Sequence, residues 1–381
     1  MTFLKMGVVL VIILALLCGV HYYLAHRICN CMRSFFPKLH IAVPIVMMAV
    51  LTVMMFLSIA RPFQGMTQRI ISFIGTCWMG LFVYLLLFFL AADLICLLVG
   101  LLKLFPAAAQ KFRLAMGIGA MALALITSVY GFCHANRLYT VDYDIQLSEQ
   151  TSSRMNIVML SDLHLGAVNS EARLENIVAR INQLEPDLVC IAGDFFDNDY
   201  KSILDPQRAI ETLKRIRATY GVYVCFGNHD AGSGFGEMEH FLERANIRLL
   251  KDEYVVIDGR LVLAGRLDPS PIGGYNGIGR KELSAVLEGA DPDLPVIVMD
   301  HNPVNVDSYP GEVDLVFSGH THRGQIFPGS LITARLFAVD YGYYRTASGT
   351  QVIVTSGVST WGLPMRVGTN CELVNVKLEL P

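Results

Sequence analysis

The chain has 381 residues and a formal net charge of −3, and 53% of its residues are hydrophobic while only 17% are charged. A typical soluble domain has about 25% charged residues, so this composition excludes a chain that is soluble throughout. The missing charge falls almost wholly in the first third, which separates an apolar part from an ordinary soluble part. The slight acidic balance argues against a nucleic-acid partner, since nucleic acids usually bind a basic face.

Four apolar segments precede residue 136, and each reaches the roughly 20 residues needed to cross a bilayer core. They cover residues 3–24, 40–60, 70–102 and 114–134. We therefore predict a transmembrane region of four helices over residues 1–135, whose first segment is an uncleaved anchor because three further spans follow it.

The lysines and arginines between the spans predict the orientation. Loops one and three together carry six of these residues, and the opposite side carries four. The two sets are Arg27, Arg33, Lys38, Lys103, Lys111 and Arg113 against Lys5, Arg61, Arg69 and Arg137. This excess predicts that loops one and three are cytoplasmic, which places everything after residue 135 on the extracellular side.

Asp93 lies in the third apolar segment. Carboxylates inside a membrane often have a function, and Asp93 is the one feature suggesting that the helices themselves transport or sense something. The alternative is that Asp93 lies at the membrane interface or pairs with a neighbouring helix. The sequence leaves both alternatives open.

Residues 136–153 are predicted to be a linker, and residues 154–381 to be an α/β domain with layered architecture. Helical spacing of apolar residues predicts helices over 170–184 and 205–217, with Pro206 in the first turn of the second. Short apolar runs between and after them predict strands. These runs are 156–160, 187–192, 221–226, 254–264, 295–299, 313–317, 351–355 and 372–380.

Polar residues follow five of these predicted strands at the point where each strand ends. They are Asp162 and His164; Asp194 and Asp197; Asn228, His229 and Asp230; Asp300 and His301; and His320 and His322. The carboxyl ends of strands in an open α/β sheet border a common crevice where ligands bind. Five such ends therefore predict one site built from nitrogen and oxygen ligands.

The ligand set contains no thiolate, which favours Mn, Fe or Zn in a site unlike a structural cysteine-type zinc site. Seven potential ligands are too many for one tetrahedral ion, so they indicate two divalent metal ions about 3.5–4 Å apart that share a carboxylate. Gly193, Gly227 and Gly319 each precede a proposed ligand, where the backbone must turn sharply and approach the site closely.

The motifs "DLH", "GDFFD", "GNHD", "DHNP" and "GHTH", in this order and spacing, resemble the calcineurin-like metallophosphoesterase superfamily. The resemblance covers residues 154–381 and is closest to its bacterial membrane-associated branch and to transmembrane proteins that carry this domain. The stretch "GVSTWGLPMRVG" (357–368) is similar to the closing loop of that branch. The resemblance implies a four-layer sandwich, in which helices flank two central β-sheets, and the hydrolysis of phosphate esters.

The resemblance also implies roles for individual residues. Asp162, His164 and His322 would hold one metal ion, and Asn228, His301 and His320 the other, with Asp194 bridging the two. His229 would protonate the leaving group or stabilise the phosphoryl oxygens, Asp230 would orient His229, and Asp197 would support the site. Arg323 stands where related chains often have glycine. Both Arg323 and Arg366 are candidates for binding a substrate phosphate.

Together these features predict a membrane-anchored phosphoesterase that uses two metal ions to hydrolyse a phosphodiester or phosphomonoester. Anchoring at a bilayer favours a lipid-linked or envelope substrate. One alternative is a non-catalytic metal-binding sensor or interaction module on the same fold. Another is a nucleotide-lipid pyrophosphatase, which would need the domain in the cytoplasm. The oligomeric state and the choice between monoester and diester stay open.

Overall fold

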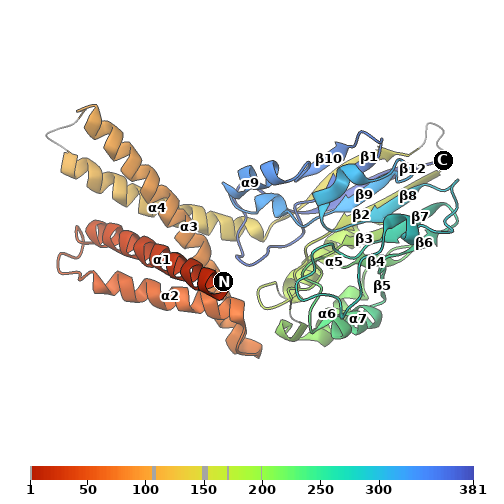
Figure 1. Cartoon of the computed structure of the whole chain (residues 1–381), viewed down its shortest axis with the longest axis horizontal. Helices are drawn as coiled ribbons and strands as arrows, with labels where there is room; N and C mark the ends of the chain where they lie inside the picture. The colour runs from red at the N-terminus through yellow and green to blue at the C-terminus, as the bar shows by residue number, and fades with distance from the viewer. Residues whose placement is uncertain (1, 105–108, 148–152, 170, 199) are drawn as a thin grey trace. The chain divides into compact units, whose positions relative to one another are not determined.

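The computed structural model describes residues 2–104, 109–147, 153–169, 171–198 and 200–381 (Figure 1). These residues form two compact units. One unit contains Met1–Pro62 and Ile70–Gly131, which hold most of the first four helices; the other contains Phe132–Pro381 together with the short segment Phe63–Arg69.

The first unit is built from long apolar helices. They are α1 (Thr2–Met32), α2 (Ala42–Ala60), α3 (Gly65–Leu101) and α4 (Ala109–Ala135). Among the described residues these four helices are long and apolar enough to cross a membrane, with mean hydropathies of 2.5, 2.5, 2.7 and 1.8. The four predicted segments thus correspond to four helices, although α1 continues beyond residue 24 to Met32.

Asp93 of α3 is paired within this unit. The Tyr23 hydroxyl of α1 donates a hydrogen bond of 2.6 Å to the Asp93 carboxylate, and the Arg27 guanidinium lies 3.0 Å from it. Arg27 also lies over the ring of Phe89, 5.4 Å from its centroid. Pairing with a neighbouring helix, one of the two predicted alternatives, is therefore what the structure has. Arg27 lies within α1, and four more of the counted residues also lie within helices: Lys5, Arg69, Lys111 and Arg113. Outside the helices the count becomes three against two, with Arg33, Lys38 and Lys103 on one side and Arg61 and Arg137 on the other.

Replacing Asp93 with Leu should weaken the association of α1 with α3, because Arg27 then loses its counter-ion among apolar side chains. We expect a loss of about 1–2 kcal/mol of stability, typical of polar contacts between membrane helices. Thermal unfolding of the purified full chain in detergent measures this loss. The double variant Asp93→Leu with Arg27→Leu should recover most of it. Equal losses in the single and double variants would contradict the importance of the pair.

The second unit contains two six-stranded mixed sheets. Sheet 1 runs in the order β1 (Leu138–Gln146), β12 (Cys371–Leu380), β2 (Ser153–Leu160), β3 (Leu188–Ala192), β4 (Val222–Cys225) and β5 (Ile247–Leu249). Sheet 2 runs β10 (Gly342–Arg345), β11 (Gln351–Val354), β9 (Leu315–Ser318), β8 (Val296–Met299), β7 (Leu261–Gly265) and β6 (Glu253–Ile257). Strands β2 to β5 are parallel to one another, as are β7, β8, β9 and β11. Their ends therefore lie along common edges.

Helices cover the outer faces of these sheets. They are α5 (Glu171–Gln183), α6 (Pro206–Leu213), α7 (Phe235–Arg244) and α8 (Leu283–Val286), with 3-10 turns at Tyr200–Ser202, Pro303–Ser308 and His322–Gly324. A further helix, α9 (Gly329–Leu336), has no buried residue and belongs to none of the apolar cores. One apolar core joins sheet 1 to α5, α6 and α7, a second lies between the sheets, and a third covers the far face of sheet 2. This arrangement confirms the predicted sandwich of two central sheets flanked by helices (Figure 1).

The helices follow the sequence signals closely. In α5, Leu174, Ile177 and Ile181 are buried at helical spacing, as predicted, while the predicted first residue, Ser170, lies outside the described residues. The Asp205 side chain caps α6 by accepting a hydrogen bond of 3.0 Å from the backbone N–H of Arg208. Helix α6 ends at Leu213, four residues before the predicted end at 217.

Three strands lie where the sequence predicted none, and one predicted strand is a hairpin. Strand β1 lies within 136–153, the predicted linker, where it pairs in parallel with β12; residues 148–152 of that segment lie outside the described residues. Strands β5 and β10 are short and lie at sheet edges. The run 254–264 turns back on itself as β6 and β7, because Asp258 and Gly259 adopt positive φ values of 52° and 65°.

Candidate metal centre

The side chains that follow the five strands β2, β3, β4, β8 and β9 meet at one place. Strands β2, β3 and β4 belong to sheet 1, and β8 and β9 to sheet 2. The crevice is thus formed by the ends of two sheets and not by one open sheet. Seven nitrogen and oxygen ligands were predicted here, and the structure brings all of them together in two adjoining groups.

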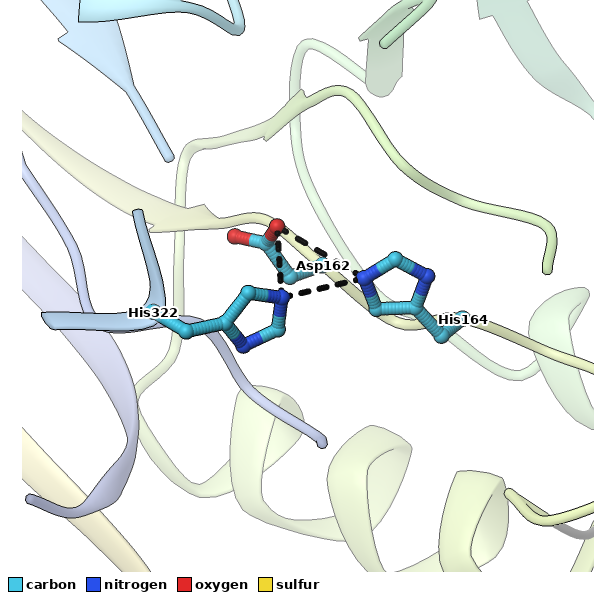
Figure 2. A group of neighbouring side chains, drawn as sticks. All are labelled: Asp162, His164 and His322. Carbon is cyan, nitrogen blue, oxygen red and sulfur yellow. Dashed lines mark hydrogen bonds and ion pairs between the residues drawn. The ribbon is translucent and has the colours of Figure 1, made fainter. Parts of the chain in front are cut away.

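The first group contains Asp162, His164 and His322, which are buried, and their ligand atoms lie within 4.8 Å of one another. Figure 2 shows both imidazole rings turned toward the carboxylate. Nε2 of His322 lies 3.2 Å from Oδ1 of Asp162 and 3.1 Å from Nε2 of His164. Three atoms that can donate electron pairs thus face one small space.

The second group contains Asp194, His301 and His320, and it meets the same 4.8 Å limit. Nε2 of His301 lies 3.1 Å from Oδ2 of Asp194. The Asn228 side chain joins the group, because its Oδ1 lies 2.9 Å from Nδ1 of His320.

Asp194 links the two groups. Its Oδ2 lies 3.1 Å from Nε2 of His301 in the second group and 3.7 Å from Nε2 of His164 in the first. Its other oxygen, Oδ1, accepts a hydrogen bond of 2.9 Å from the backbone N–H of His229. This bond fixes the carboxylate so that Oδ2 faces both groups.

The hydrogen bonds of His301 show why a cation fits here. Nδ1 of His301 lies 2.8 Å from the carbonyl oxygen of Ala192, which can only accept, so Nδ1 must carry a proton. Nε2 of the neutral ring then presents its lone pair to an oxygen of Asp194 that also has only lone pairs. Nε2 is buried and has no hydrogen-bond partner among the described residues. Two facing acceptors need a positive charge between them. Although burial lowers the pKa of His301, the Asp194 carboxylate raises it well above its usual value, so a proton on Nε2 can supply that charge, and a bound metal ion would take the place of this proton.

The local electrostatics keep most of these groups ready to bind a cation. Burial lowers the pKa of His320 to about 4 and also lowers the pKa of His164 and of His322. For Asp162 burial acts in the opposite direction, but nearby histidines, His322 foremost, hold the pKa well below its usual range. At neutral pH the acid is therefore charged and these imidazoles are neutral, which are the forms that bind metals.

The backbone of the site is strained. Five of the seven predicted ligands have positive φ values: Asp162 (57°), His164 (44°), Asp194 (49°), His320 (70°) and His322 (48°). Such conformations cost on the order of 1–3 kcal/mol each and persist only where the surrounding structure enforces them. Strain concentrated on the ligands themselves is typical of a functional site.

The predicted close approach of the backbone at three glycines is confirmed. At Gly193, which has a φ of 80°, an added Cβ would lie 2.6 Å from the ring of His301. An added Cβ at Gly227 would collide with Asp194, and one at Gly319 with Ser161 and Asp162. Each position therefore has room for hydrogen but not for a methyl group.

Replacing Gly193 with Ala should displace the His301 ring and strain the backbone. We expect a loss of about 2–4 kcal/mol, the sum of the left-handed conformation and the overpacking. The matched control is Gly236→Ala in α7, where an added Cβ meets nothing within 4 Å. Thermal unfolding of the full chain in detergent compares the two variants. A destabilisation no larger in Gly193→Ala than in the control would contradict the close approach.

Two of the predicted aspartates near the site, Asp197 and Asp300, differ in what they contact. Asp197 contributes an oxygen within 4.8 Å of nitrogens of His164 and His229, so it lies beside the first group. The buried Asp300 carboxylate instead pairs with Arg280, at 2.5 Å, and accepts a hydrogen bond from the Tyr309 hydroxyl. Asp300 therefore anchors the loop after β8 and does not face the ligands.

Asp230 holds backbone and not the His229 ring. Its carboxylate accepts hydrogen bonds from the backbone N–H groups of Phe195, Phe196 and Gly227, at 3.1, 2.7 and 2.9 Å. Burial, with the nearby charge of Asp194, raises the pKa of Asp230 to about 8. Since Nδ1 of His229 has no hydrogen-bond partner among the described residues, this placement argues against the predicted role of Asp230 in orienting His229.

The two candidate substrate arginines differ in position. The Arg323 guanidinium lies 4.2 Å from the centroid of the Tyr341 ring and is partly exposed. Arg366 is completely buried, and its guanidinium donates to the carbonyl oxygens of His322, Ser356 and Ser359. This placement argues against substrate binding by Arg366, which instead ties the closing loop to the backbone of a predicted ligand.

Replacing Arg366 with Met should cost about 3–5 kcal/mol, because three buried carbonyl groups lose their donor. Arg323→Met is the matched variant and should cost less than about 1 kcal/mol, the size of an exposed cation–π contact. Thermal unfolding of the full chain measures both. Unchanged stability in Arg366→Met, combined with weaker substrate binding, would restore the predicted substrate contact.

A pocket of about 460 Å³ opens onto the ligands. His164, Asp194, Asn228, His320 and His322 form its polar side, and His229 also lines it. The His229 ring lies between His164 and Trp361, with centroids 5.1 and 5.5 Å away. Its apolar side chains are Ile272, Ile326, Trp361 and Leu363, and we call this part of the lining the apolar side.

The sequence did not single out the residues that build this apolar side. Gln325 holds it together: its buried amide donates to the carbonyl oxygens of Trp361 and Leu363, both at 2.9 Å, and accepts from the N–H of Trp361 at 2.8 Å. The "GVSTWGLPMRVG" stretch did point to the segment that carries Trp361. No comparable signal marks Gln325 or Ile272, because their role arises only from contacts between distant loops.

Comparisons with known proteins agree with this site. The calcineurin-like phosphoesterase family matches residues 155–324. An uncharacterized metallophosphoesterase of Aquifex aeolicus is 31% identical over 262 residues, which cover 68% of this chain and 98% of that protein. The chain therefore has a metallophosphoesterase domain. It belongs to the calcineurin-like phosphoesterase family, as the sequence motifs predicted.

Two further relatives are named as transmembrane proteins. The "transmembrane protein with metallophosphoesterase domain" of Bos taurus is 32% identical over 278 residues, covering 68% of this chain and 62% of that protein. Its counterpart in Danio rerio is 28% identical over 277 residues, with the same coverage of 68% and 62%. The match spans somewhat less than two thirds of the length of both relatives.

Proposed function

We propose that the chain is a membrane-anchored phosphoester hydrolase with a centre of two divalent metal ions. The observation that carries the proposal is the position of Asp194, whose Oδ2 faces nitrogens of both ligand groups at 3.1 and 3.7 Å. Single-metal sites have no need of a carboxylate shared in this way. Membership of the phosphoesterase family supports the reaction class.

The proposed ligands fall into the two groups described above. Asp162, His164 and His322 hold one ion, Asn228, His301 and His320 hold the other, and Asp194 bridges them. When bound, two such ions stabilise the charge of a phosphoryl group and activate a water molecule. Manganese, iron or zinc suits this set of nitrogen and oxygen ligands.

His229 is the proposed proton donor to the leaving oxygen. Its ring lines the pocket beside the ligands, and its Nδ1 has no hydrogen-bond partner among the described residues. Its backbone N–H is bound to Asp194, so the ring is held at a fixed place relative to the bridging carboxylate. A positioned histidine contributes typically 10²- to 10⁴-fold in rate.

The proposed substrate is a phosphodiester or phosphomonoester of a lipid-linked or envelope molecule. The apolar side of the pocket supports an apolar group next to the phosphate, and the four apolar helices support a bilayer location. The excess of loop lysines and arginines supports an extracellular domain. In this proposal the substrate phosphate lies at the ligands, and its apolar group lies against Ile326 and Trp361.

Replacing Asp194 with Asn should abolish turnover, because an amide cannot bridge two cations. We expect at least a thousandfold loss of kcat/KM on a chromogenic phosphodiester or monoester, on the scale of about 4 kcal/mol. The purified full chain in detergent is first stripped of metal and then supplied with Mn, Zn or Mg. His229→Ala should lose about 10²- to 10⁴-fold in kcat while still binding metal.

The matched control is Asp293→Asn, the same chemical change at an exposed loop position outside the pocket. It should keep full activity. Metal content determined by elemental analysis separates the two parts of the proposal. If two ions are bound but neither ester is hydrolysed, the proposed substrates are wrong. If the folded chain binds no metal, the proposed two-metal centre is wrong.

A further inference from the structure

Helix α9 (Gly329–Leu336) has no buried residue. Its apolar side chains face outward: Leu331, Ile332 and Leu336 are 61%, 60% and 70% exposed. Phe327, just before the helix, is 47% exposed. A short helix in a globular domain normally buries its apolar side chains, so this exposed group needs another explanation.

The α9 face continues into the apolar side of the pocket. Ile326 lines the pocket and directly precedes Phe327. Trp361 lines the pocket while remaining 50% exposed, and the amide of Gln325 ties its backbone to the segment that leads into α9. We call the exposed side chains of Phe327, Leu331, Ile332, Leu336 and Trp361 the apolar rim.

The C-terminal end of α9 contacts the loop that carries the predicted ligands His320 and His322. The Phe337 ring lies 6.0 Å from the ring of His320, centroid to centroid. The Thr333 hydroxyl donates to the Asp340 carboxylate, and the Thr321 hydroxyl donates to the Asp340 carbonyl, both at 2.6 Å. Through Asp340 and Phe337, helix α9 thus contacts the loop that carries His320 and His322. Its exposed apolar side chains belong to the rim.

Three observations make a lipid bilayer the fitting occupant of this rim. The same chain carries four helices apolar enough to span a membrane. Only Asn136 and Arg137 separate the end of α4 from the first strand of the domain, so no long linker removes the domain from the bilayer. Residues 325–338 contain no acidic residue and one arginine, Arg335, which suits anionic lipid headgroups.

We propose that the apolar rim docks on the bilayer that the chain's own helices span, so that the pocket receives the phosphoester headgroup of a membrane lipid. This inference rests on the proposed function and narrows its substrate to a lipid drawn from that bilayer. The apolar rim contacts the acyl region, Ile326 and Trp361 guide the lipid, and its phosphate reaches the ligands at the polar side of the pocket.

Fluorescence of Trp361 tests the docking without any activity measurement. The chain has two tryptophans, so Trp78→Phe leaves Trp361 as the single emitter. This full-length variant is reconstituted in mixed phosphatidylcholine and phosphatidylglycerol vesicles with and without brominated acyl chains. Docking predicts roughly twofold quenching of Trp361 by the brominated lipid, because interfacial tryptophans enter the headgroup and acyl boundary.

Adding Leu331→Ser, Ile332→Ser and Leu336→Ser together should remove most of this quenching. The matched control adds Val256→Ser, since Val256 is also an exposed apolar side chain, at 47%, but belongs to the edge strand β6. The control should leave the quenching unchanged. Quenching that persists in the triple variant overturns the role of α9.

Failure of the docking and failure of the proposed function give different results in the same vesicles. Unquenched Trp361 together with metal-dependent turnover of bis(p-nitrophenyl) phosphate overturns the docking alone. Quenched Trp361 without turnover supports the docking and contradicts the enzyme. If Trp361 is unquenched and its emission shifts with protein concentration, a second copy covers the rim, which also overturns the proposal.

Discussion

The centre depends on one carboxylate oxygen, Oδ2 of Asp194, held between nitrogens of His301 and His164 at 3.1 and 3.7 Å. Nδ1 of His301 donates a hydrogen bond to a backbone carbonyl, so Nε2 of the neutral ring is an acceptor that faces the Asp194 oxygen. A buried cluster of facing lone pairs costs free energy unless cations lie among them. The arrangement therefore suits a bound cation, and the hydrogen bonds to the Ala192 carbonyl and from the His229 N–H aim His301 and Asp194 toward it.

This requirement explains the strained backbone nearby. Side chains from five strands in two sheets must converge on a space only a few ångströms wide, so the chain turns abruptly after each strand. Asp162, Asp194 and His320 therefore adopt positive φ, and Gly193 lets the end of β3 approach His301 of the other sheet. The three apolar cores keep the sheets rigid enough to maintain these conformations.

Much of this could be predicted because strong local signals coincide. An apolar run followed by Asp, His or Asn identified every proposed ligand, and amphipathic spacing identified α5. Strand β1 was missed because it is a half-exposed edge strand whose partner, β12, lies more than two hundred residues away. The Asp258–Gly259 turn was a readable hairpin signal. The roles of Asp230, Asp300 and Arg366 could not be read, since residue type does not reveal which backbone groups a buried charge will contact.

The same limit explains why the substrate side of the pocket emerges only from the structure. Ligands for a metal ion are few in kind and lie at strand ends, so their positions are constrained. The apolar side needs only hydrophobic residues at the right place, and Ile272, Ile326 and Trp361 come from three separate loops. Gln325 joins two of these loops through its amide. In the proposed function the polar side, which carries the family motifs, sets the reaction. These loops, together with the exposed face of α9, are then the parts of the site proposed to select among phosphoesters by what is attached to the phosphate.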